Sequence, residues 1–323
     1  MILKRYGEVV RRLTKFCRQN NRASDFAAGF CVFRLIGDIY IMAIKIVGII
    51  ALYNPTAADF ANVEKYIDGL DECLLLDDSG NNNLSECKDF IEKHPGRVHY
   101  MPNETNVGLT KSVNRGFEKA IADGADWVLV MNPDGVFEND AIGIYRDYIE
   151  NHDCSNVAII VPQYNFDRHP RKAGVGLKTV KYADMSGSLY NTKVLKKIGL
   201  YDPKTFFYGL DTEYCLRVKK NDYRMIECSA AVLHHQPAHT ETLKIGNKVI
   251  FRYGKDVPVR YYYQFRSGYY IHYLYHDFKQ DAFMIYKFLK VIFFFDNKKE
   301  YLRLIKKAKA DYKNGYFGKL QEK

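Results

Sequence analysis

The chain has 323 residues, of which 47% are hydrophobic and 27% charged, and this composition indicates a globular protein and excludes a largely disordered one. Charge is uneven, because residues 241–323 hold 18 Lys and Arg against 8 Asp and Glu, whereas residues 42–240 hold 22 against 27. The seven cysteines form no CxxC pair, which argues against a disulfide framework or a zinc site and for free thiols in a reducing compartment.

Apolar runs and helix-like segments alternate along the chain. The runs predict strands at residues 45–53, 73–77, 97–101, 126–132 and 156–161, and the segments between them predict helices at 57–70, 84–93 and 109–122. This alternation is typical of an α/β fold with a Rossmann-like, mostly parallel sheet flanked by helices. Later in the chain, short strands are predicted at 224–228 and 231–235, and helices at 260–278 and 286–309.

The first four predicted strands end in residues rich in Asp, Asn, Gly and Pro. These segments are 53–55, 77–80, 103–108 and 132–135. Because ligands of parallel α/β sheets bind at the carboxyl ends of the strands, the segments predict a polar cleft. No GxGxxG or GxxxxGK[ST] sequence follows a strand, which excludes the common dinucleotide fingerprint and the P-loop.

Eight short stretches, taken together, resemble one known family. They are LYNP (52–55), LLDDSG (75–80), ETNVGLTKSVNRGFEKA (104–120), WVLVMNPDG (127–135), MSGSLY (185–190), FFYGLDTEYCLRVKKNDYR (206–224), AVLHH (231–235) and PVRYYYQFRSG (258–268). In this order and at this spacing, across residues 45–275, the chain resembles the family 2 glycosyltransferases of the GT-A fold, and in particular their rhamnosyltransferase-like branch.

The resemblance implies three parts. Residues 42–240 would form the GT-A catalytic domain, with a nucleotide-binding half at 45–135 and an acceptor half at 136–240. Residues 241–323 would form a helical C-terminal extension that is basic and aromatic. Residues 1–41 match nothing in the family, and are either a basic amphipathic extension or the result of a misplaced start.

The family's metal site is implied by two segments. Members use a DxD triplet after the fourth strand, and here the triplet is Asn132-Pro133-Asp134, in which the first carboxylate is an amide. The resemblance implies that Asp134 and His235 bind Mg2+ or Mn2+ beside the donor diphosphate, with Asn132 next to them. His234 stays an alternative ligand, and a plain turn is the alternative interpretation of the triplet.

Asp211 is the candidate general base. In an inverting transfer, a carboxylate takes the proton of the acceptor hydroxyl while the nucleoside diphosphate leaves from the opposite face. Asp211 opens a predicted helix, whose N-terminal dipole favours the ionised form, and its alternative role is that of an N-cap. Glu213 and Arg217 are predicted to form a supporting i, i+4 ion pair, with acceptor contact as the second interpretation.

The donor base is expected at the ends of the first two strands. The resemblance implies that Tyr53 stacks on a uracil or thymine ring and that Asp77 accepts the imide N–H of that ring. Asp78 follows directly and stands where many relatives have Asn. The expected donor is therefore a dTDP- or UDP-sugar.

Phosphate and ribose contacts are expected near a predicted helix N-terminus. Asn106, Gly108, Lys111 and Asn114 lie there, where backbone N–H groups favour anions, although an ordinary surface lysine is the preferred interpretation of Lys111. Gly187 is expected to let the backbone approach the donor, and a simple turn is the alternative.

These features predict an inverting transferase that moves a sugar, with rhamnose as the best candidate, to a hydroxyl of a glycan or polyprenyl-linked glycan in cell-surface polysaccharide synthesis. Galactofuranosyl, galactosyl or glucosyl transfer is an alternative, and so is a degenerate nucleotide-sugar binder without activity. A nucleotidyltransferase is disfavoured because residues 51–59 lack a Gly-rich basic loop.

The basic and aromatic C-terminal part predicts a membrane surface as partner. Residues 283–309 are expected to form a helix with one apolar and one basic face, which would hold a cytoplasmic enzyme peripherally at the inner face of the cell membrane. Packing of the apolar face on the catalytic domain or on a partner subunit is the alternative. Nucleic acid is disfavoured because no recognised binding module is present, and the apolar stretch 27–53 is too interrupted by charges to span a bilayer.

Overall fold

The computed structural model describes residues 44–167, 170–235 and 238–321, and the chain from Ile44 onward forms one compact unit. The predicted N-terminal extension, residues 1–41, lies outside the described residues. The predicted domain boundary at 240 stays a prediction.

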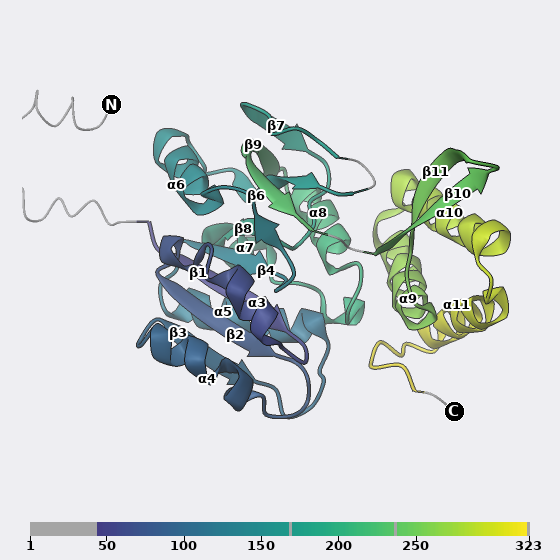
Figure 1. The fold of residues 1–323 in the computed structure, drawn as a ribbon, viewed down its shortest axis with the longest axis horizontal. Helices are drawn as coiled ribbons and strands as arrows, with labels where there is room; N and C mark the ends of the chain where they lie inside the picture. The colour runs from purple at the N-terminus through teal and green to yellow at the C-terminus, as the bar shows by residue number, and fades with distance from the viewer. Residues whose placement is uncertain (1–43, 168–169, 236–237, 322–323) are drawn as a thin grey trace, which may run out of the picture. The chain divides into compact units, whose positions relative to one another are not determined.

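A parallel sheet brings four strand ends to one edge of the unit (Figure 1). In this sheet β1 (Ile46–Leu52) lies between β2 (Glu72–Asp77) and β4 (Trp127–Met131), and β3 (Val98–Pro102) pairs with β2. Each of these strands lies within one residue of its predicted bounds. Apolar runs such as IVGIIAL form strands here because helices cover both faces of the sheet.

Three helices connect these strands. The bounds of α4 (Leu84–Lys93) and α5 (Leu109–Ala122) are the predicted ones. The helix predicted at 57–70 is shorter, because α3 (Ala57–Val63) is followed by a separate 3-10 turn, η1 (Ile67–Gly69). The chain leaves α5 at Gly124, whose φ of +80° is easily reached only by glycine.

Beyond β4 the sheet becomes mixed. Next to β4 come, in order, β8 (Ser188–Asn191), β6 (Val157–Asn165) and β9 (Arg224–His234), and β9 also pairs with β5 (Val136–Phe137) and β7 (Leu177–Val180). The prediction of two strands at 224–228 and 231–235 is wrong. A bulge opposite Pro162 and Gln163 lets one strand, β9, span both pieces.

The core has a layer on each face of the sheet. On one face, Ile46 and Ile50 of β1 share a cluster with Phe90 of α4 and Tyr145 of α6 (Ala141–Asn151). On the other face, Val47 and Ile49 of β1 pack in a cluster with residues of α5, α7 (Thr192–Ile198) and α8 (Leu210–Lys220). This three-layer arrangement confirms the predicted fold class.

The C-terminal part begins with a hairpin that was not predicted. It consists of β10 (His239–Ile245) and β11 (Lys248–Lys255), and it is followed by α9 (Pro258–Tyr275), α10 (Phe278–Phe294) and α11 (Lys298–Lys313). These elements share a third apolar cluster. None of the described helices is long and apolar enough to cross a membrane.

The single helix predicted at 286–309 is also wrong. The chain leaves the helical conformation at Phe295, and α10 and α11 are separate helices. Phe295 is buried, with its ring edge-on to the rings of Tyr261 and Tyr301 at centroid distances of 5.6 and 4.8 Å. Burial of this ring, together with Asn297 at the N-cap of α11, favours a break over a continuous helix.

Candidate active site

Asp134 and His235 meet at one edge of the sheet. Asp134 follows β4 and precedes β5, whereas His235 follows β9. The antiparallel pairing of β5 with β9 places Val136 opposite His234, which brings the preceding and following residues together. As a result, His235 Nδ1 lies 3.4 Å from Asp134 Oδ1.

The pair has the chemistry of a metal site. The His235 side chain is 9% exposed, and its enclosed Nδ1 has no hydrogen-bond partner among the described residues. Burial alone would raise the pKa of the Asp134 carboxyl, but His235 holds it below its usual value. A carboxylate and an imidazole nitrogen whose one close polar contact is that carboxylate together fit a divalent cation such as Mn2+.

The described residues contain no group of three or more His, Cys, Asp or Glu side chains able to hold a metal. An ion at Asp134 and His235 would therefore take its remaining ligands from donor phosphates and water, as Mg2+ commonly does.

His234 differs from its neighbour. It lines the same open pocket, which is bordered by Asp134, Val136, Asn165, Phe166, Asp167, Pro170, His234 and His235. Its Nε2 lies 2.9 Å from Glu138 Oε2, so this ring already has an acidic partner. Of the two histidines, His235 is therefore the better candidate ligand.

Asn132 and Gly187 lie where two segments of the site touch. The backbone N–H of Asn132 donates to Ser186 Oγ at 3.2 Å. Gly187 has a φ of +76°, and its N–H donates to the Val130 carbonyl at 2.8 Å. A Cβ on Gly187 would lie 2.8 Å from Leu233 Cδ2. These contacts explain Gly187 as a tightly packed turn; no donor contact is needed to account for it.

Asp211 lies at the start of α8, half-buried. It is not the N-cap, because Gly209 occupies that position with a φ of +82°. Burial raises the pKa of Asp211 to about 7, and the nearby Asp184 carboxyl adds to the rise, although hydrogen bonds from Thr212 oppose it. The helix dipole was expected to lower the pKa of Asp211, but burial and the Asp184 carboxyl outweigh that effect.

Asp184 is a site residue that no sequence pattern identified. It lies in the loop before Gly187. Its side chain reaches solvent, but the many protein atoms around the carboxyl group partly desolvate it. This environment raises the pKa of Asp184, while His235 opposes the rise. Because Asp184 interacts electrostatically with both Asp211 and His235, it links the candidate base to the candidate metal ligands.

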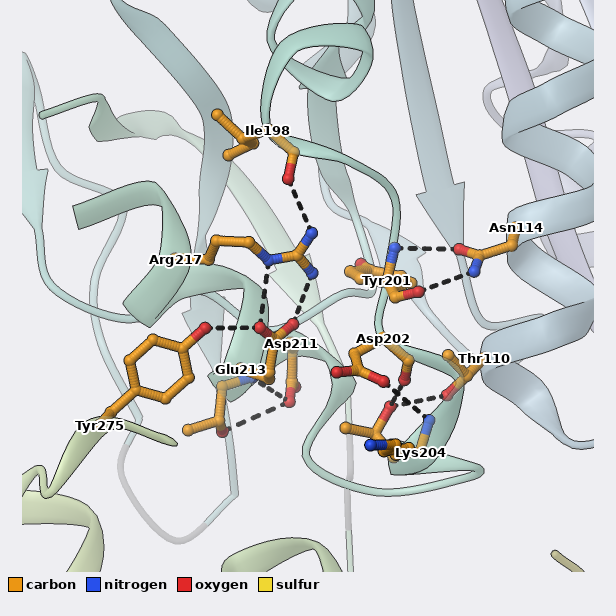
Figure 2. A network of polar contacts seen from close by, with 12 residues as sticks. Thr110, Asn114, Ile198, Tyr201, Asp202, Lys204, Asp211, Glu213, Arg217 and Tyr275 are labelled. Atoms are coloured by element: carbon orange, nitrogen blue, oxygen red, sulfur yellow. Dashed lines mark hydrogen bonds and ion pairs between the residues drawn. The ribbon is translucent and has the colours of Figure 1, made fainter. Parts of the chain in front are cut away.

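Glu213 and Arg217 form the predicted ion pair. Arg217 Nε and Nη2 donate to the two Glu213 oxygens at 3.1 and 2.5 Å, and Tyr275 OH donates to Glu213 Oε1 at 2.6 Å (Figure 2). Arg217 Nη1 also donates to the Ile198 carbonyl at 2.9 Å. Glu213 is only 2% exposed, so these residues support α8 from within the protein.

A second group of contacts in Figure 2 fixes the loop that leads to Asp211. Asn114 of α5 makes two hydrogen bonds to the backbone of Tyr201, at 2.8 and 3.0 Å. Thr110 Oγ1 lies 3.0 Å from Thr205 Oγ1. Asn114, expected near phosphate or ribose, is thus occupied in holding this loop.

Asp77 is fully buried at the end of β2. Its carboxylate accepts hydrogen bonds from Tyr100 OH at 2.7 Å, Asn83 Nδ2 at 2.8 Å and the Ser79 N–H at 3.0 Å, and it also contacts Ser79 Oγ. These four donors occupy the usual acceptor positions of a carboxylate. A hydrogen bond from the uracil or thymine of the donor to Asp77 would require one of these four groups to move.

Asp78 is held in a similar way. It accepts hydrogen bonds from the N–H groups of Val107 and Gly108 at 2.9 and 3.0 Å and from Asn103 Nδ2 at 3.0 Å. Burial nevertheless raises the pKa of Asp78. The two aspartates thus organise the loops after β2 and β3.

Three other predicted donor contacts have accessible side chains. Tyr53 is 61% exposed, Lys111 is exposed and Asn106 is half-buried. Tyr53 and Tyr263 of α9 interact electrostatically, so the loop after β1 lies near the C-terminal part.

Comparison with known proteins relates part of this chain to one family. Residues 60–208 match the model described as glycosyl transferase family 2. The low-salt glycan biosynthesis hexosyltransferase Agl10 of Haloferax volcanii is 24% identical over 213 residues, which cover 58% of this chain and 67% of that protein. The dTDP-rhamnosyl transferase RfbF of Shigella flexneri is 23% identical over 248 residues, or 70% of this chain and 79% of that protein.

A solved structure agrees on the fold. The crystal structure of GalNAc-T7 with UDP, GalNAc and Mn2+ superposes with a TM-score of 0.50 at 14% identity, covering 60% of this chain. The chain spans only 44% of the length of that protein, and the likeness concerns the fold alone. With the matched family model and the two relatives, this likeness indicates a hexosyl-transferring enzyme on the GT-A fold that is similar, over residues 60–208, to glycosyltransferase family 2.

Proposed function

We propose that this enzyme transfers a hexosyl group, rhamnose first among the candidates, from a dTDP- or UDP-sugar to a hydroxyl of a glycan or polyprenyl-linked glycan, with inversion at the anomeric carbon. The observation that carries the proposal is the pair Asp134 and His235 at one edge of the sheet, together with Asp184, which interacts electrostatically with both His235 and Asp211. Rhamnose is put first because one relative is named a dTDP-rhamnosyl transferase.

In this mechanism the proton of the acceptor hydroxyl passes to the Asp211 carboxylate as the new glycosidic C–O bond forms. The bond between the anomeric carbon and the diphosphate breaks on the opposite face, and the nucleoside diphosphate keeps the electron pair. A pKa near 7 suits a base that must be ionised and still accept a proton. Glu213, Arg217 and Tyr275 keep α8, and with it Asp211, in place.

Asp134 and His235 would hold a divalent cation, which would supply charge neutralisation for the departing diphosphate. Asn132 would lie beside the same phosphates. Tyr53 would stack on the base, and Asn106 and Lys111 would be free to contact phosphate or ribose. The loops held by Asp77, Asp78 and Gly108 would form the rest of the nucleotide site.

The proposed site of action is the cytoplasmic side of the cell membrane, in cell-surface polysaccharide synthesis. Its support is the excess of Lys and Arg in residues 241–323, 18 against 8 Asp and Glu, which suits an anionic lipid surface. Galactofuranosyl, galactosyl and glucosyl transfer are competing specificities of the same site. Asn132, in place of a carboxylate, favours a binder without activity as the second candidate function.

A donor panel tests the proposal. Calorimetry with Mn2+ would compare dTDP-rhamnose, UDP-glucose, UDP-galactose and UDP-galactofuranose, and NMR would then follow the anomeric configuration of the released or transferred sugar. We expect dTDP-rhamnose to bind most tightly and the product to have the inverted configuration. A retained configuration would refute the single displacement, and binding without turnover of any donor would favour the inactive binder.

A further inference from the structure

Helix α10 differs from an ordinary surface helix. It exposes large apolar side chains and turns two of its lysines toward the protein. Seven large apolar residues, here called the α10 apolar face, are exposed: Phe278, Phe283, Ile285, Tyr286, Phe288, Leu289 and Phe293. Phe278 is 82% exposed and Phe293 68%, whereas Lys290 of the same helix is 7% exposed. Surface helices of globular proteins normally bury their apolar face and expose their charges.

The orientation of α10 is fixed by its lysines. Lys287 Nζ donates to Gln264 Oε1 of α9 at 2.8 Å, and Lys290 Nζ donates to the Gly254 carbonyl of β11 at 2.5 Å. Val291, on the same side of the helix, is fully buried. Since both amines are bound to neighbouring elements, the apolar face must point outward.

The basic face expected in residues 283–309 belongs to α11 instead. Tyr301, Leu304, Ile305 and Ala308 of α11 are buried, and its exposed side is a basic stripe formed by Lys299, Arg303, Lys306, Lys309 and Lys313. Within the described residues, none of these five side chains forms an ion pair. The apolar and basic surfaces thus lie on two neighbouring helices.

Charge decides between the possible occupants of the α10 apolar face. A large exposed apolar surface marks an interaction site. Residues 241–323 hold 18 Lys and Arg against 8 Asp and Glu, so docking a second copy would bring like charges together. An anionic lipid surface offers the opposite charge, and each nearby Lys or Arg strengthens binding to it about fivefold.

We propose that α10 docks the enzyme on an anionic lipid bilayer, with the α10 apolar face in the boundary between headgroups and acyl chains and the α11 basic stripe drawn to the headgroups. The helix has 17 residues and lies in the plane of the surface rather than across it. The inference names the surface that contacts lipid, and it depends on neither the donor nor the acceptor proposed above.

Vesicle flotation with the full chain tests the docking surface. The vesicles contain phosphatidylcholine alone or with about one third phosphatidylglycerol. The wild type should float with the anionic vesicles, less so at high salt. The combined variant Phe278→Ser, Ile285→Ser, Leu289→Ser and Phe293→Ser should bind at least tenfold more weakly. It replaces only exposed side chains, and an unchanged circular dichroism melt would show that it is folded.

A matched control removes apolar surface elsewhere. Val249 and Ile250 of β11 are 44% and 47% exposed, and the double variant Val249→Ser, Ile250→Ser should float like the wild type. Changing Lys299, Arg303 and Lys306 to Gln should abolish the preference for anionic vesicles. The proposal is overturned if the wild type does not float at low salt, or if the α10 variant floats as well as the wild type. A dimer that dissociates only in the α10 variant, without vesicle binding, would instead identify a second copy as the occupant.

Discussion

Tyr275, at the end of α9, donates a hydrogen bond of 2.6 Å to the buried carboxylate of Glu213 in α8. Both residues lie beyond the segment 60–208 that matches the family model. Because Asp211 and Glu213 both belong to the first turn of α8, this contact connects the C-terminal helices to the helical turn that carries the candidate base.

Replacing Tyr275 by Phe should therefore affect both stability and turnover. The change removes one of the two hydrogen bonds to Glu213 Oε1 and leaves that of Arg217 Nε, and loss of a hydrogen bond to a charged group should cost about 1.5–3 kcal/mol of unfolding free energy. Turnover should fall with little change in donor affinity. Urea unfolding and steady-state kinetics measure the two effects. Tyr273→Phe is the control, since Tyr273 is on the same helix and 66% exposed; an equal effect of both variants would contradict the assigned role.

Asp211→Asn should lower turnover by roughly 10²–10⁴-fold with nearly unchanged donor affinity, because the variant keeps the shape of the side chain but cannot accept the proton. The wild-type kcat/KM should rise with pH through about 7, since the pKa of Asp211 is raised to that value and only the ionised form acts as base. Near-wild-type turnover of the variant would disprove the assignment.

Asp184→Asn should move the acid limb of that pH profile. The Asp184 carboxyl contributes to the raised pKa of Asp211 by repulsion, so removing its charge makes Asp211 easier to ionise. The limb should shift to lower pH. Asp222→Asn, an exposed change just beyond the other end of α8, should leave it in place. A shift to higher pH, or none, would mean that the two carboxyls do not interact in the enzyme.

The two adjacent histidines allow a matched test of the metal site. His235→Ala should weaken Mn2+ binding by more than about tenfold, because loss of a ligand should cost at least as much as loss of a group that orients one. His234→Ala should change it little, since that ring is paired with Glu138. EDTA should abolish transfer, and Mn2+ or Mg2+ should restore it. Calorimetric titration of Mn2+ measures the first effect; full activity in EDTA would argue for a metal-independent enzyme.

Sequence patterns predicted the four parallel strands β1 to β4 and missed strands such as β7, β10 and β11. The runs in β1, β2 and β4 are unbroken and apolar, so their bounds were predictable to within one residue. By contrast, β7 has the sequence LKTV with an exposed pattern, and β10 and β11 contain many polar residues. Such strands form because a partner strand is available, and their own sequences carry little signal.

The residues of the candidate site were likewise predictable from the sequence only in part. The order of the family's motifs along the chain predicted Asp134 and His235 as metal ligands, and the structure brings these two residues together. No local pattern could indicate the contact of Glu213 with Tyr275, because 62 positions separate the two residues and the C-terminal helices must pack first. The proximity of Asp184 to Asp211 likewise depends on the turn at Gly187 and on the loop before α8.

Gly187→Ala should separate packing from backbone strain at that turn. Gly187 and Gly96 have similar φ values, +76° and +73°, so alanine at either position should cost about 1–2 kcal/mol for the left-handed conformation. Only at Gly187 would the added Cβ meet other atoms, 2.8 Å from Leu233 Cδ2 and 3.1 Å from Pro162 Cγ, whereas nothing lies within 4 Å of a Cβ on Gly96. Overpacking of this kind should add about 1–3 kcal/mol. Urea unfolding of the two variants measures the difference directly. Equal losses would show that the turn yields to the methyl group, and a loss of donor binding by a fully stable Gly187→Ala enzyme would restore the interpretation in which this backbone contacts the donor.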